Sequence, residues 1–104
     1  MKPILLALLL AATASAEAKA QSVGQASYYS HPRYRGLIAA HRTFPLGTHV
    51  RVVNLNNGRA ATVVIVDRGP FIRSRIIDVS TSAAEILGFR RAGVARVRLE
   101  VVNK

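Results

Sequence analysis

The chain has 104 residues, of which 15 are Lys or Arg and 5 are Asp or Glu, and it contains no cysteine. This length allows one domain, and the lack of cysteine excludes disulfides and thiolate metal sites. The formal net charge of +10 indicates either an anionic partner or a basic surface that only aids solubility.

The first twenty residues have the layout of a secretory signal peptide. After a positive start, residues 4–12 form an unbroken apolar run, and small residues follow. We expect residues 1–20 to hold the signal peptide and a short lead-in, with cleavage after Ala16 or Ala20. A membrane anchor or a buried helix is the alternative, but a spanning helix needs about 20 apolar residues. We therefore expect an exported protein, periplasmic or secreted, without stable membrane insertion.

Because we expect the protein to be exported, its basic charge favours a different partner from that of a basic cytoplasmic protein. A basic cytoplasmic protein would suggest nucleic acid, which an exported protein rarely meets. An acidic polymer outside the cytoplasm is the better partner, because arginine pairs with carboxylates through two parallel hydrogen bonds. Peptidoglycan, with its lactyl and peptide carboxylates, meets that description. No cysteine follows the apolar run, so we expect no lipid anchor.

Short runs rich in Val, Ile and aromatic residues predict β-strands in the remainder of the chain. Turn residues separate these runs, and Asn57-Gly58 between two of them indicates a hairpin. The expected strands cover residues 26–30, 48–54, 60–66, 75–79 and 95–102. The last of them alternates most clearly between apolar and charged residues, as a half-buried strand does.

Residues 81–87 are the one good helix candidate. Ser80 or Ser82 can cap the start of this helix, and Gly88 can end it. Five or so short strands with one short helix predict a mainly β domain, a small closed barrel, which we place at residues 24–103.

Asp67 is the best-placed group for chemistry. It ends an apolar strand and opens a Gly-Pro turn, where the strand fixes the backbone and the turn leaves the side chain accessible. Capping that turn through backbone N–H groups is the alternative role. Asp78 stands just before the helix, and we expect it to cap the helix or pin a loop. No pair of histidines has metal-ligand spacing, so we expect neither a metal nor a cofactor.

Several segments together resemble the RlpA (rare lipoprotein A) family of septal-ring lytic transglycosylases. The matching segments are residues 24–29, 39–48, 50–55, 66–71, 75–80, 83–88 and 93–95, in the order that the family has them. The most specific block is Val66-Asp67-Arg68-Gly69-Pro70-Phe71. The resemblance covers essentially the whole chain after the signal peptide.

The resemblance implies a six-stranded double-psi β-barrel that cuts peptidoglycan glycan strands, preferably those without stem peptides. Cleavage between N-acetylmuramic acid and N-acetylglucosamine would leave 1,6-anhydro ends. The family pattern makes Asp67 the catalytic group, first acid and then base, with His41 nearby in the groove as a helper. Because the C6 hydroxyl of the sugar replaces water, one carboxyl group suffices. From the matching segments we expect Tyr28, Arg68 and Phe71 to contact the glycan, and we expect a monomer.

One departure from the family pattern keeps a second hypothesis open. The loop at residues 30–38 is shorter than in the family and lacks the glutamate that family members carry there. This loss favours a non-catalytic wall-binding module of expansin type, whereas the presence of both Asp67 and His41 favours the enzyme. A hydrolase of the family-45 type ranks last, because the sequence offers no obvious second carboxylate.

Overall fold

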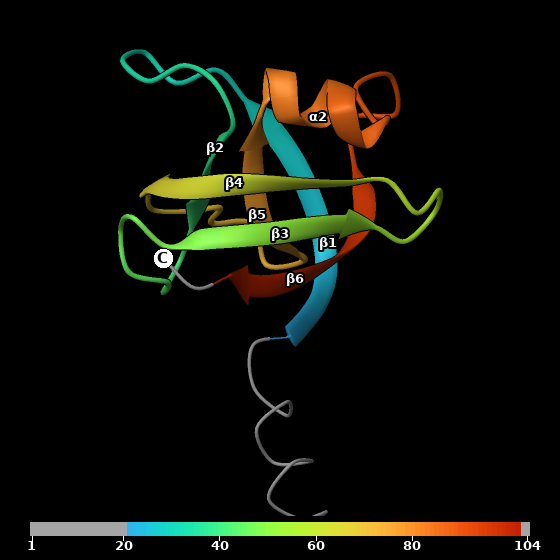
Figure 1. The fold of residues 1–104 in the computed structure, drawn as a ribbon, viewed down its shortest axis with the longest axis horizontal. Coiled ribbons are helices and arrows are strands. Elements are labelled where there is room, and N and C mark those ends of the chain that lie inside the picture. The colour runs from blue at the N-terminus through green and yellow to red at the C-terminus, as the bar shows by residue number, and fades with distance from the viewer. Residues whose placement is uncertain (1–20, 103–104) are drawn as a thin grey trace, which may run out of the picture.

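A computed structural model describes residues 21–102, which form six strands and one short helix (Figure 1). In chain order the elements are β1 (Gln21–Tyr29), β2 (Ile38–His41), β3 (His49–Asn54), β4 (Ala60–Asp67), β5 (Arg75–Ser80), α2 (Thr81–Leu87) and β6 (Ala95–Val102). The expected signal peptide lies outside the described residues. Within them, no helix has the length and apolar character that crossing a membrane requires.

The strands close into a barrel in the order β1-β5-β2-β4-β3-β6. The pairs β1–β5 and β2–β4 are parallel, and the other pairs are antiparallel. The last strand, β6, closes the barrel because it pairs with both β1 and β3. The predicted mainly β fold, a six-stranded double-psi barrel with one short helix, is confirmed.

The barrel interior is filled by small and branched side chains from alternate strand positions. On β6, Ala95, Val97 and Leu99 are buried, as the alternation of this strand predicts. Helix α2 covers one end of the barrel and adds Leu87 to the core (Figure 1). Its caps are those expected, since the Ser80 side chain accepts a hydrogen bond from the N–H of Ala83 at 3.3 Å and Gly88 ends the helix at φ 81°.

The structure departs most from the expectations at β1 and β2. β1 begins at Gln21, before the expected start of the barrel at residue 24, because residues 21–23 pair with β6. The run Ile38–His41 was not predicted as a strand, because all four of its residues are buried and show no alternation. This short β2 lies between β4 and β5, and it holds the centre of the site described below.

Candidate active site

Three neighbouring strands bring two carboxylates to one face of the barrel. Asp67 on β4 and Asp78 on β5 both pair with Ala40 of β2, which lies between them. Residues directly paired across a sheet point to the same face, so the two acidic side chains flank Ala40. From the sequence, only a role in capping the helix or pinning a loop is expected for Asp78. Its Oδ1 accepts a hydrogen bond from the Ser27 hydroxyl of β1.

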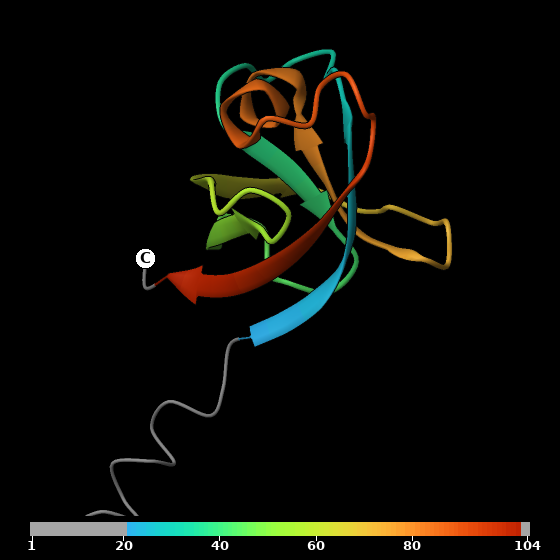
Figure 2. The same ribbon diagram turned by 90° about the vertical axis from the view of Figure 1, so that its right-hand side faces the viewer.

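A β-bulge turns Asp67 away from the core. Ala39 pairs with Ile65, but Ala40 pairs with Asp67, so Val66 is left without a partner on β2. Ile65 is fully buried, and strict alternation would send Asp67 to the same interior side. The extra residue re-aims the carboxyl group outward, and 46% of its side chain is exposed. The following loop projects from the barrel in Figure 2, and Gly69 within it has a φ of 123°, which favours glycine.

The two oxygens of Asp67 have different surroundings. Oδ1 accepts a hydrogen bond from the backbone N–H of Arg68 at 2.8 Å, as the turn-capping alternative expects. Oδ2 lies 3.7 Å from Nε2 of His31, whose side chain is 11% exposed. Nδ1 of His31 accepts hydrogen bonds from the N–H groups of Arg33 and Tyr34, so the ring proton belongs on Nε2, toward Asp67. One oxygen is therefore held by the loop, and the other faces the site.

Tyr29 lies on the same face of β1 as Ser27, beside the two carboxylates. Its hydroxyl is buried and has no hydrogen-bond partner among residues 21–102. Burial first, then the negative charges of Asp67 and Asp78, and last the side chain of Asp67 as a hydrogen-bond acceptor, raise the pKa of Tyr29 to about 12. The phenol therefore stays protonated at physiological pH and can act only as a neutral donor.

His41 lies one residue beyond Ala40 but makes no hydrogen bond or ion pair to Asp67 in the described structure. Its ring stacks on Phe44, with centroids 3.7 Å apart and planes 6° apart. Its Nδ1 accepts hydrogen bonds from the N–H groups of Thr43 and Phe44 at 3.1 and 3.0 Å. Burial, followed by the charges of Arg42 and Arg68, lowers its pKa, so a neutral ring with the proton on Nε2 is favoured. The histidine whose ring nitrogen lies within ion-pair distance of Asp67 is His31.

Two arginines hold the loops of this site to each other. Nη1 of Arg68 donates to the carbonyls of His41 and Phe44 at 3.0 and 2.8 Å. In return, Nη1 of Arg42 donates to the carbonyls of Pro70 and Arg75, both at 2.8 Å. We call this pair, Arg42 and Arg68, the arginine clamp. The guanidinium of Arg68, which we expected to contact glycan, is used within the protein.

The remaining expected contact residues lie on different sides of the barrel. Phe71 follows Asp67 in the projecting loop and is 82% exposed, so its ring is available to a ligand. Tyr28 points to the opposite face of β1 from Tyr29. Its ring lies 6.0 Å from that of Phe89, and its hydroxyl donates to the carbonyl of Arg90 at 2.9 Å. Phe71 thus has an exposed ring four residues beyond Asp67, whereas Tyr28 points away from the face of β1 that carries Ser27 and Tyr29.

A pocket of about 440 Å³ opens next to the carboxylates, between the loop after β1 and the start of α2. Tyr29 and His31 belong both to its lining and to the surroundings of Asp67, so these two residues lie between the pocket and the carboxyl group. The rest of the lining is Ser30, Tyr34, Arg35, Gly36, Ser80, Thr81, Ser82 and Glu85. Hydroxyl groups, a guanidinium and an aromatic ring suit a polar, ring-shaped ligand.

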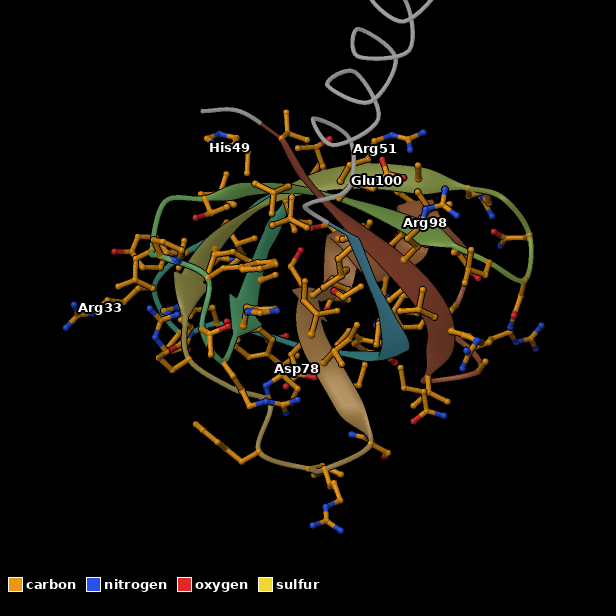
Figure 3. The ribbon with its side chains drawn as sticks, turned by 90° about the horizontal axis from the view of Figure 1, so that it is seen from below. Arg33, His49, Arg51, Asp78, Arg98 and Glu100 are labelled. Carbon is orange, nitrogen blue, oxygen red and sulfur yellow. The ribbon has the colours of Figure 1, made fainter. Side chains whose placement is uncertain are left out.

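The other acidic side chains of residues 21–102 differ from the two site carboxylates because they form ion pairs with arginines. Glu85 pairs with Arg90, and Glu100 pairs with Arg51 and Arg98. The Glu100 group lies apart from Asp78 in Figure 3, on the β3–β6 side. Among the described residues, no group of three or more His, Asp or Glu side chains is placed to hold a metal ion. The chemistry that the site offers is proton transfer by carboxyl groups.

Comparisons with known proteins give one family and one fold. The lytic transglycolase family model matches residues 21–99. A probable endolytic peptidoglycan transglycosylase RlpA of Nostoc sp. is 56% identical over 68 residues, which are 65% of this chain and 18% of the relative. Endolytic peptidoglycan transglycosylase RlpA of Pseudomonas aeruginosa is 48% identical over 68 residues, 65% of this chain and 20% of the relative. The chain thus spans about a fifth of the length of these curated relatives.

Solved structures with the same fold are more distant in sequence. An expansin of Clavibacter michiganensis superposes with a TM-score of 0.68 at 18% identity, over 81% of this chain and 51% of the expansin. The Streptomyces papain inhibitor superposes with a TM-score of 0.65 at 23% identity, over 80% of this chain and 94% of the inhibitor. At these identities the similarity establishes the barrel and does not identify the activity.

Proposed function

Because the chain belongs to the lytic transglycolase family, we propose that it cleaves the glycan strands of peptidoglycan, with Asp67 as the catalytic acid and base. The observation that carries this proposal is the outward bulge at Val66, which turns the half-exposed carboxyl group of Asp67 toward His31, a residue that lines the pocket. The RlpA relatives named above support the substrate class. A wall substrate places the protein outside the cytoplasm, in the periplasm or secreted, and we propose that it acts as a monomer.

The two oxygens of Asp67 have different roles in the proposed mechanism. Oδ1 is held by the N–H of Arg68, so Oδ2 is the oxygen that would carry the catalytic proton. That proton passes to the glycosidic oxygen between N-acetylmuramic acid and N-acetylglucosamine, and the bond breaks through an oxocarbenium-like state. Oδ2 then takes the proton of the muramic C6 hydroxyl, and O6 closes onto C1. The products are a 1,6-anhydro end and a free C4 hydroxyl, and no water is consumed.

The residues around Asp67 support these two steps. His31 presents Nε2–H to Oδ2, where it favours the ionised state that follows the first proton transfer. His41, kept neutral by burial and two arginines, can donate to the sugar from β2. The exposed ring of Phe71 offers a flat apolar surface for a pyranose ring on the loop side of the scissile bond. The pocket beside Tyr29 accommodates the strand on the other side.

Mass spectrometry of the cleavage products tests the proposal. Peptidoglycan with and without stem peptides is incubated with the protein, with Asp67→Asn and with Glu100→Gln. Glu100 on β6 is a matched control, since its carboxylate pairs with Arg51 of β3 and Arg98 of β6. We expect anhydro ends from the wild type and Glu100→Gln, at least a hundredfold fewer from Asp67→Asn, and more from stripped glycan. Binding without cleavage would support a wall-binding module of expansin type instead.

Asp78 favours a hydrolase as the second candidate function. The sequence offered no obvious second carboxylate, but the structure places one across Ala40 from Asp67. Two carboxylates on either side of a glycosidic bond are the usual equipment for hydrolysis. The same experiment separates the two reactions, because a hydrolase yields reducing ends and loses them equally in Asp67→Asn and Asp78→Asn.

A further inference from the structure

We propose that Tyr29 is a positioning residue for Asp67, and that its buried hydroxyl donates a hydrogen bond to Oδ2 when this carboxyl group ionises. The catalytic consequence rests on the proposed function, whereas the contact itself does not. The hydroxyl is the starting observation, because it is buried and has no hydrogen-bond partner among the described residues. An unpaired buried hydroxyl destabilises a fold, so its retention calls for a nearby acceptor.

The side chain of Asp67, and not that of Asp78, contributes to the raised pKa of Tyr29 as a hydrogen-bond partner, which favours the free Oδ2 of Asp67 as the acceptor. Oδ1 of Asp67 is taken by the N–H of Arg68, and Oδ1 of Asp78 by the hydroxyl of Ser27. Tyr29 and His31 line the pocket together, and Nε2 of His31 already faces Oδ2 at 3.7 Å. Tyr29 would therefore approach Oδ2 as a second donor, from β1.

The titratable and charged groups around Asp67 come from every element packed on it. They are Tyr29 on β1, His31 in the following loop, His41 on β2, Asp78 on β5, and Arg42 and Arg68 in the two clamped loops. The two arginines direct their Nη1 atoms to backbone carbonyls, and Asp78 adds negative charge. Within this set, Tyr29 combines a raised pKa, which keeps its hydroxyl protonated to high pH, with a hydroxyl group that donates no hydrogen bond of ordinary distance and angle.

A donor to the carboxylate affects the two catalytic steps in opposite ways. It stabilises the ionised form, which removes the proton of the C6 hydroxyl, and it lowers the fraction of protonated Asp67 at the start. The activity of a protonated acid is lost on the alkaline side of the pH profile. Removal of the Tyr29 hydroxyl should therefore move the alkaline limb of kcat/KM to higher pH, which a purely structural role would not do.

Neighbouring tyrosines provide a matched pair of variants for the test. Tyr29→Phe removes the proposed donor, and Tyr28→Phe removes a hydroxyl that bonds the carbonyl of Arg90 on the other face of β1. The carboxyl carbon of Asp67 is titrated by ¹³C NMR in the wild type and both variants, and kcat/KM on stripped glycan is measured against pH. We expect Tyr29→Phe to raise the titration midpoint and the alkaline limb by about 0.5–1 pH unit, with no change in Tyr28→Phe.

An unchanged midpoint in folded Tyr29→Phe overturns the proposal, and so does an equal shift in both variants. A raised midpoint in a protein without glycan cleavage would support the contact and refute the transglycosylase function, so the two failures are distinguishable. If Tyr29→Phe does not fold, the reciprocal measurement applies, because coupling between two sites is mutual. Asp67→Asn should then lower the pKa of Tyr29 from about 12 toward its usual value, and an unchanged pKa would overturn the proposal.

Discussion

The arginine clamp should stabilise the fold as a coupled unit. Arg68→Ala and Arg42→Ala each remove two hydrogen bonds of 2.8–3.0 Å from a charged donor to backbone carbonyls. A buried bond of this kind contributes about 1.5–3 kcal/mol, but one of each pair lies exposed to solvent. We therefore take about 1 kcal/mol per bond, or about 2 kcal/mol per arginine. In a domain of this size the Tm falls by roughly 10 °C for each variant.

Urea unfolding of the single and double variants measures the coupling. Each arginine anchors the loop that carries the other, so loss of either one loosens the bonds of its partner. The double variant should cost about 1 kcal/mol less than the sum of the single ones. Arg96→Ala is the control, because this exposed β6 arginine makes no side-chain hydrogen bond or ion pair within residues 21–102, and it should cost less than about 0.5 kcal/mol.

Activity provides a second readout of the same clamp. Arg68→Lys keeps the charge but cannot reproduce the planar donor group that reaches two carbonyls at once. At a temperature where the variant is folded, we expect kcat to fall about tenfold as the loops of Asp67 and His41 move apart. Additive stability costs, or single costs no larger than that of Arg96→Ala, would refute the idea of a clamp.

The lowered pKa of His41 means that the unfolded chain binds its proton first as the pH falls below about 6.5, so unfolding free energy should drop there. His41→Asn, which keeps the acceptor for the turn, should flatten this dependence in thermal melts between pH 5 and about 7. Asn54→Ala should lower the free energy of unfolding in urea by about 2–3 kcal/mol, because the buried side-chain amide of Asn54 donates a hydrogen bond to the carbonyl of Leu87 and accepts one from the N–H of Asn56. Asn57→Ala, at the rim, should lower it by less than about 1 kcal/mol. Phe71→Ala should leave the Tm within about 1 °C and raise KM for glycan several-fold, whereas a lowered Tm would assign the ring a structural role.

Sequence signals predict those elements whose formation depends on residues next to them in the chain. The helix at residues 81–87 is marked by Ser80 before it and Gly88 after it, and both act as caps in the structure. β6 is marked by alternation along its own length. β2 lacks such a signal, since its burial comes from β4 and β5, which follow much later in the chain. The register that places Asp78 opposite Asp67 is likewise a property of the closed barrel.

The site shows the same division between local and long-range information. Asp67 is predictable because its strand and turn adjoin it in the sequence. The choice between Tyr28 and Tyr29 is not, because adjacent strand residues point to opposite faces and only the pairing of β1 with β5 says which face carries the carboxylates. His31 and His41 are each followed by N–H groups that bond Nδ1, so their local geometry is alike. The path of the loop alone brings His31 to Asp67.

The closure of the barrel by its last strand has a consequence for how this chain acquires its structure. β1 is flanked by β5 and β6, and β3 pairs with β6 on one side, so the first strand of the chain cannot complete its pairing until the last strands are present. Contacts between such distant segments form slowly. A nascent or truncated chain that stops before Ala95 keeps bare edges on β1 and β3, where copies can associate. Cooperative folding should therefore begin only after the C-terminal strand has been synthesised.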